Sequence, residues 1–244
     1  MTNEFDRIQY APIQNHRYER WFREVQYNGK ELNEDGKKEF LQMVDEIISI
    51  HLEGLPVLKE ALDSIKDLHD EFHEAYRVVI SVLQFTIITM IDSMVISKYF
   101  ILADKDYDRR FMRGKMKVIL NEGFKKLYGF EEKTHQKSEW NRLVPILKIF
   151  PEDIKVQYKQ LSSLLEEHSK SSSWWRNERN VETHLNAEKL YESRSEDVVE
   201  SKVMMESLKL FDTLYAVNRF LTNMYACFLN SLIHKYRRGE LLED

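Results

Sequence analysis

The fold is decided by the stretch VVISVLQFTIITMI, residues 78–91, which is the most apolar part of the chain. Arg77 and Asp92 bound it, so its length of about 14 residues falls short of the roughly 20 that a membrane-spanning helix needs. Apolar residues continue to Ile101, as expected of a helix that is surrounded by other helices. These residues therefore predict the central helix of a helical bundle.

The composition of the 244-residue chain predicts an all-α fold around this helix. Seven glycines and four prolines are too few for the turns of an all-β protein of this size, whereas Leu, Lys, Glu and Met abound. A hydrophobic content of 43% is enough for one continuous core. We expect a single multi-helix bundle domain over residues 31–244, preceded by an N-terminal arm, residues 1–30, whose aromatic side chains can anchor it to the bundle.

Apolar residues at helical spacing predict a series of helices on both sides of the central one. The segment Gly54-Leu55-Pro56 is expected to end the first helix, and Gly129 to cap the helix that follows the central one. The sequence allows a break in the predicted helix 57–103 at residues 69–74. The predicted helices cover residues 35–53, 57–103, 106–128, 138–149, 152–168 and 196–237.

The last of these helices carries an apolar seam. Its members alternate steps of four and three residues, which suits packing against a partner helix. The seam consists of Leu210, Leu214, Val217, Leu221, Met224 and Phe228.

Charge and cysteine content exclude several classes of protein. A formal net charge of -5 argues against a general nucleic-acid coat and against a strongly cationic membrane binder. Cys227 is the only cysteine, so neither an intramolecular disulfide nor a Cys-x-x-Cys zinc site can form. Because the first thirty residues lack the apolar centre of a secretory signal, we expect a cytoplasmic protein that does not bind a membrane.

Residues suited to chemistry are concentrated in the hexapeptide Arg179-Asn180-Val181-Glu182-Thr183-His184. Arginine holds phosphate through a fork of donors, and histidine transfers protons near neutral pH. On a helix Asn180 and His184 face the same way, so the amide can orient the imidazole. The Cα of Arg179 lies about 140° around the helix axis from His184. Joint action therefore requires an arginine that curls back, a helix that starts near Arg179, or a second subunit.

The order Arg, Asn, three variable residues and His resembles the Arg-polar-xxx-His signature of HEPN domains. The match covers six residues, and the setting is similar too: a helix late in an all-α bundle, followed by another long helix. HEPN proteins are helical bundles that dimerise so that two copies of the motif face one cleft. Many are metal-independent endoribonucleases of toxin or antiviral systems, and others are inactive binding modules. The resemblance implies a homodimer, an RNA ligand, no metal or other cofactor and, for a toxin, an antitoxin-like protein partner.

The resemblance also implies a role for each residue. His184 would transfer a proton at the ribose 2′-hydroxyl or the leaving 5′-oxygen, while Arg179 would stabilise the charge on the scissile phosphate and Asn180 would orient the imidazole. The products would be a 2′,3′-cyclic phosphate and a 5′-hydroxyl, and DNA would not be cleaved. The alternative interpretation is structural, with His184 on a helix surface or interface and Arg179 paired with Glu178 or Glu182.

Three residues just before the hexapeptide fit the same function. Trp174 and Trp175 can stack on unpaired bases, and Arg176 adds a second cation. The two tryptophans can equally well close the core at the start of a helix.

A second group of cations lies in the predicted helix 106–128. Arg109, Arg113 and Lys117 follow one another at spacings of four, which places them on one face, opposite the stripe of Met, Ile and Leu. This face either guides an RNA backbone or is an ordinary solvated face.

Metal-dependent chemistry has weaker signals. His69 and His73 have the spacing of zinc ligands on a helix, but the residue after His69 is aspartate, not the glutamate that a zinc peptidase uses as its base. A ferritin-like di-metal bundle needs two Glu-x-x-His pairs; Glu132 and His135 form one, and residues 70–73 form another only with aspartate substituted. No Gly-rich phosphate loop or Ser-His-Asp order is present.

The leading hypothesis is therefore an HEPN-like RNA-binding protein or metal-independent endoribonuclease that acts through Arg179, Asn180 and His184. The alternative is a non-catalytic interaction protein whose apolar seams, residues 78–101 and 210–232, bind a partner helix or a second copy of the chain. A ferritin-like di-metal bundle is the third hypothesis.

Overall fold

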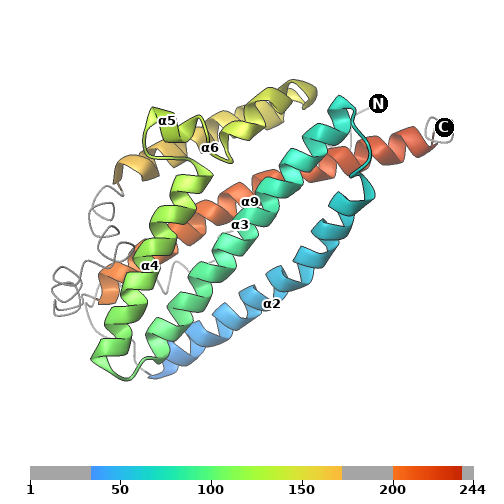
Figure 1. The fold of residues 1–244 in the computed structure, drawn as a ribbon. Helices are drawn as coiled ribbons and strands as arrows, with labels where there is room; N and C mark the ends of the chain where they lie inside the picture. The colour runs from blue at the N-terminus through green and yellow to red at the C-terminus, as the bar shows by residue number, and fades with distance from the viewer. Residues whose placement is uncertain (1–33, 172–199, 238–244) are drawn as a thin grey trace.

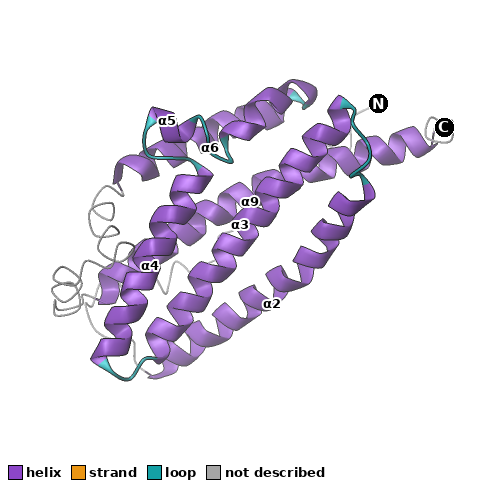
Figure 2. Ribbon diagram, in the orientation of Figure 1, coloured by secondary structure: helices purple, strands orange, loops and turns teal. Residues whose placement is uncertain are grey.

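The computed structural model describes residues 34–171 and 200–237, and within these ranges the chain forms helices and no strand. The prediction of an all-α bundle is thereby confirmed, and Figure 2 shows long helices joined by short loops. Figure 1 shows α3 between α2 and α4, with α9 packed against α3 from the other side. The hydrophobic core therefore forms around α3.

The central helix, α3 (Glu71–Leu102), begins directly after its N-cap residue, Asp70. The side chain of Asp70 accepts a hydrogen bond of 2.8 Å from the backbone N–H of His73, and Glu71 and Glu74 complement the helix dipole in the first turn. Within the described ranges, α3 is the one helix long and apolar enough to cross a membrane, but 61% of its most apolar window is buried by the rest of the bundle. Such burial is typical of the core helix that the sequence predicted.

The prediction that Gly54-Leu55-Pro56 ends the first helix is wrong. Helix α2 (Glu34–Ser64) runs through Pro56 and ends at Ser64, so the connection to α3, residues 65–70, overlaps only the start of the region, residues 69–74, where the sequence allowed a break. A proline inside a helix removes one backbone hydrogen bond. Helix α2 nevertheless continues because it packs along α3 on both sides of Pro56, burying Phe40, Met43, Val44 and Leu58.

Helix α4 (Asp106–Leu127) ends as predicted at Gly129. The backbone N–H of Gly129 donates to the carbonyl of Phe124, and its φ of 85° lies in the region that favours glycine. A Cβ at this position would lie 2.5 Å from the backbone nitrogen of His135. The chain then forms the single turn α5 (Glu132–His135), the 3-10 helix η2 (Asn141–Ile149) and helix α6 (Glu152–Ser171).

The long helix α9 (Glu200–Arg237) confirms the predicted seam, and its partner is α3 of the same chain. The six seam residues are all buried: Leu210, Leu214, Val217, Leu221, Met224 and Phe228. Within the described residues these six side chains therefore pack inside the bundle, against α3 of the same chain.

Two glycines inside helices give a matched test of how closely α3 and α4 pack. A Cβ on Gly123 of α4 would lie 2.7 Å from Cγ2 of Thr89, and that side chain is held in place because its hydroxyl donates to the carbonyl of Phe85 at 2.9 Å. A Cβ on Gly54 of α2 would have no heavy atom within 4 Å.

We expect Gly54→Ala to raise the free energy of unfolding by roughly 0.5–1 kcal/mol, because alanine is the better helix former. Gly123→Ala gains the same propensity but overpacks the α3–α4 contact, so we expect a net loss of about 1 kcal/mol. Urea unfolding of both variants measures the difference. Equal stabilisation by the two substitutions would contradict the close approach of the two helices.

Candidate functional site

The residues predicted from the hexapeptide and its neighbours lie outside the described residues, on the connection from α6 to α9. The distance between the Arg179 guanidinium and the His184 imidazole therefore stays a prediction. The structure describes the end of α6 and the start of α9, the two helices that this connection joins. The predicted residues on the connection are Trp174, Trp175, Arg176, Arg179, Asn180 and His184.

His168, three residues before the end of α6, joins three helices. Its ring stacks on Phe124 of α4 with ring centroids 4.6 Å apart, and its Nδ1 lies 3.4 Å from Oγ1 of Thr213 of α9. Burial, with the charge of Lys209 as a second cause, lowers the pKa of His168 to about 4. A neutral imidazole therefore holds the end of α6 against α4 and α9 at neutral pH.

The early part of α9 is held by a second buried contact. The hydroxyl oxygens of Ser97 in α3 and Ser207 in α9 lie 2.9 Å apart, and both residues are fully buried. The Ser97 hydroxyl also lies 2.8 Å from the carbonyl oxygen of Ser93. Together with the His168 junction, this contact sets the position of the first half of α9, which packs against α4.

The prediction of a solvated cationic face on α4 is wrong. Arg113 is only 6% exposed and Lys117 only 5%, so neither side chain is available on the surface to guide an RNA backbone. The sequence predicted the wrong limits for the buried face, because other helices cover a wider sector of α4 than the Met, Ile and Leu stripe occupies. The buried residues of α4 are Arg113, Gly114, Met116, Lys117, Leu120, Asn121, Phe124 and Leu127.

Arg109, the third member of the predicted face, has a structural role. Its Nε donates a hydrogen bond of 2.7 Å to the carbonyl of Ala103, which follows the last residue of α3. Arg109 therefore fixes the corner between α3 and α4. It shares no exposed surface with Arg113 and Lys117.

Arg113, Lys117 and Asn121 form a column of hydrogen-bond donors on α4, here called the donor column. They follow one another at spacings of four, and Lys117 lies about two turns before Phe124, which contacts His168. Asn121 is buried, and its Nδ2 has no hydrogen-bond partner within residues 34–171 and 200–237. Each of these three side chains carries an N–H donor, and all three are buried.

The donor column was only partly visible in the sequence. The sequence predicts that Arg113 and Lys117 share a face, and Asn121, which continues the same spacing, is not part of the predicted face. His168 stands alone in the sequence, and its contacts with Phe124 and Thr213 join residues that are far apart in the chain. No local pattern predicts such a contact.

The histidines considered as metal ligands make local hydrogen bonds. Nδ1 of His73 lies 2.5 Å from the carboxylate of Asp70, and Nδ1 of His135 lies 2.8 Å from the carbonyl oxygen of Tyr128. No group of three or more His, Cys, Asp or Glu side chains is placed to hold a metal ion within the described ranges. The di-metal hypothesis thus finds no set of ligands in this part of the chain.

Comparison with known proteins found no matching family model, curated protein or solved structure. The class of protein is therefore defined by the fold itself: an all-α bundle with α3 at its centre. Within that class, the feature particular to this chain is a hexapeptide of the Arg-Asn-xxx-His type on the connection between α6 and α9.

Proposed function

We propose that the protein is an HEPN-like, metal-independent endoribonuclease that binds RNA where α4, α6 and α9 meet. Arg179, Asn180 and His184 would carry the reaction. The observation that supports the proposal is the hexapeptide itself, whose segment leaves α6 and enters α9 close to two buried junctions, His168 with Phe124 and Ser97 with Ser207.

The proposed reaction needs no group beyond the side chains and the RNA. The ribose 2′-oxygen attacks the adjacent phosphorus, and the bond from phosphorus to the 5′-oxygen breaks. His184 transfers a proton at one of these two oxygens, and Arg179 stabilises the negative charge on the phosphate. Asn180 is a positioning residue that orients the imidazole. Trp174, Trp175 and Arg176 would hold unpaired nucleotides beside the scissile bond.

Cleavage of end-labelled RNA by the purified full chain in EDTA tests this function. We expect products with a 2′,3′-cyclic phosphate, and no cleavage of DNA of the same sequence. His184→Ala should lower the rate at least about a hundredfold, because it removes the group that transfers the proton.

The matched control is His51→Ala, which removes a histidine whose Nδ1 lies 2.7 Å from the carbonyl oxygen of Ile47 in its own helix. That variant should cleave RNA at the wild-type rate. Wild-type activity in His184→Ala, or the absence of any RNA cleavage by the unaltered chain, would refute the catalytic proposal.

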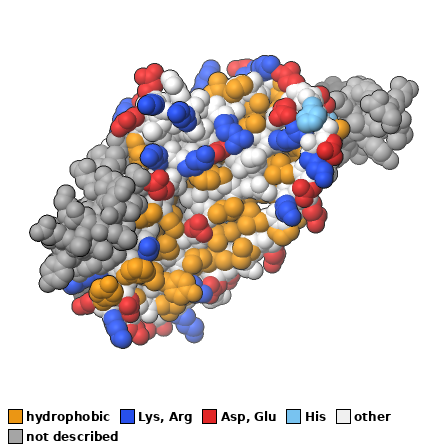
Figure 3. Space-filling model, viewed as in Figure 1, with side chains coloured by type: hydrophobic (Ala, Val, Ile, Leu, Met, Phe, Trp, Pro, Cys, Tyr) orange, Lys and Arg blue, Asp and Glu red, His pale blue; other side chains and the backbone are white. Residues whose placement is uncertain are grey.

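A second candidate function is a non-catalytic interaction protein, and exposed apolar side chains favour it. Figure 3 shows apolar side chains gathered along the middle of one face, over α3 and beside α2. Exposed apolar side chains of these two helices include Ile50 and Val57 of α2 and Ile88 of α3. A homodimer or an antitoxin-like partner would use such a surface. The molar mass of the pure protein, from light scattering during gel filtration, tests for the homodimer, and a cytoplasmic location remains part of the proposal.

A further inference from the structure

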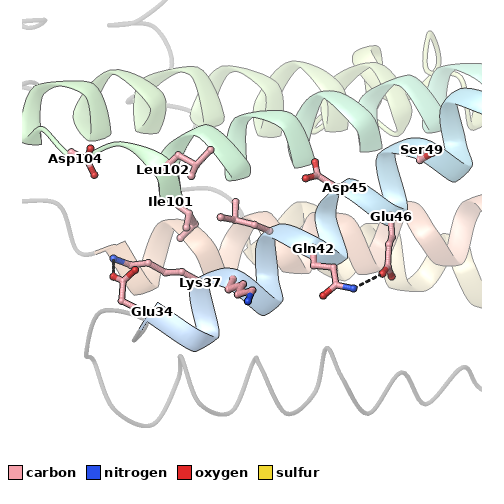
Figure 4. A pocket seen from close by; sticks show the side chains of 11 residues that line it. Glu34, Lys37, Gln42, Asp45, Glu46, Ser49, Ile101, Leu102 and Asp104 are labelled. Carbon is pink, nitrogen blue, oxygen red and sulfur yellow. Dashed lines mark hydrogen bonds and ion pairs between the residues drawn. The ribbon is translucent and has the colours of Figure 1, made fainter.

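A groove of about 840 Å³ lies between the first turns of α2 and the end of α3 (Figure 4). Leu41, Ile101 and Leu102 line it with apolar surface, and Leu102 is 47% exposed. Glu34, the first described residue of α2, also lines the groove. The chain that precedes α2 therefore joins the bundle at the edge of the groove.

The rim of the groove is acidic. Four carboxylates line it against two lysines, so the lining residues carry a net charge of -2. Part of this charge is paired: Glu34 lies 3.1 Å from Lys37, and Asp45 lies 2.6 Å from Lys98 of α3. Asp104 makes no ion pair with another described residue. The groove thus combines an apolar lining with a rim that favours a cationic ligand. The charged residues of the lining are Glu34, Lys37, Lys38, Asp45, Glu46 and Asp104.

We propose that residues 17–23 of the N-terminal arm dock in this groove. They read Arg17-Tyr18-Glu19-Arg20-Trp21-Phe22-Arg23, with three aromatic side chains, three arginines and one glutamate, so their net charge is +2. The aromatic rings match the apolar lining, and the arginines match the acidic rim.

The length of the connection allows this docking. Eleven residue steps separate Arg23 from Glu34, and an extended chain of that length spans roughly 36–40 Å. Along α2, the groove runs from Glu34 to Ser49, which corresponds to about 22 Å of helix. The arm therefore reaches every part of the groove, and covalent attachment gives it an effective concentration on the order of millimolar.

Docking of the arm would brace the corner between α3 and α4. Asp104 lines the groove, and the preceding residue, Ala103, accepts the hydrogen bond from Arg109 that fixes this corner. The docked arm would cross α2 and the end of α3, and it would thereby hold the start of α4. The inference rests on the groove and the arm, and it does not require that the protein cleaves RNA.

Limited trypsin digestion of the full chain tests the docking, because trypsin cleaves after Arg17, Arg20 and Arg23. Leu102→Lys removes apolar surface from the groove and adds a charge that repels the arginines, so we expect cleavage at these three sites to accelerate at least about tenfold. Val57→Lys is the matched control, since Val57 is 58% exposed on α2 and does not line the groove. Mass spectrometry identifies the cleavage sites, and circular dichroism verifies that both variants are folded. Equal rates in the two variants and the unaltered chain would overturn the proposal.

Disulfide trapping identifies the occupant of the groove. In a Cys227→Ser background, the pair Glu19→Cys and Gln42→Cys joins the arm to a residue that lines the groove, whereas Glu19→Cys with Lys159→Cys places the second thiol on the exposed surface of α6. We expect an intramolecular disulfide in the first pair and none in the second. A disulfide-linked dimer would show that a second copy supplies the arm, and equal trapping in both pairs would show no docking. Either result would overturn the proposal.

Discussion

Trp140→Ala is expected to lower the free energy of unfolding by about 3–5 kcal/mol, the largest effect of any substitution considered for this protein. Trp140 is 0% exposed. Its ring stacks on Tyr158 of α6 with centroids 4.8 Å apart and an angle of 6°, and it packs against Phe220 of α9 at 5.6 Å. Its Nε1 donates a hydrogen bond of 2.9 Å to the hydroxyl of Ser162.

The loss is large because alanine would leave a cavity where η2, α6 and α9 meet. The Ser162 hydroxyl would also lose its donor, although it can still donate to the carbonyl of Tyr158 at 2.7 Å. Urea unfolding followed by circular dichroism measures the change. Val144→Ala in the same 3-10 helix is the control, because Val144 is exposed and its truncation should change the free energy by less than about 0.5 kcal/mol. A loss below about 1 kcal/mol for Trp140→Ala would mean that this junction does not hold the three elements together.

Acidification from pH 6.5 to pH 4 is expected to reduce the free energy of unfolding by about 3 kcal/mol through His168 alone. The pKa of His168 is lowered from 6.5 to about 4 in the folded protein, chiefly by burial and secondly by the charge of Lys209. The unfolded chain therefore binds a proton at a pH where the folded protein does not. The contribution of His168 to stability is complete above pH 6.5 and is lost as the pH falls toward 4.

His168→Gln isolates this contribution, since glutamine does not titrate. The variant should show a weaker dependence of the unfolding free energy on pH in this range, with acidic side chains accounting for what remains. Urea unfolding at several pH values between 4 and 7 gives both curves. Parallel curves for the two proteins would mean that His168 titrates with an ordinary pKa and is not buried between α4 and α9.

The donor column shows how a pattern seen in the sequence can be assigned to the wrong environment. The spacing of Arg113 and Lys117 correctly placed the two cations on one face of a helix, but charged residues are usually solvated, so the sequence predicted an exposed face. Both are buried because the helices around α4 cover that face as well. The apolar residues Met116, Leu120 and Phe124 were predicted correctly, since the same burial includes them.

The sequence by itself determined that the chain is all-α, that α3 is the central helix, that α9 carries a seam and that Gly129 ends α4, because helical periodicity and capping depend on residues within a few turns of each other. The tertiary structure alone decided that α2 continues through Pro56, that Arg113 and Lys117 are buried, and that Phe124, His168 and Thr213 meet. It also decided that α2 and the end of α3 enclose a groove. Each of these depends on which helix lies opposite a given face, and that follows from how the whole chain minimises its exposed apolar surface.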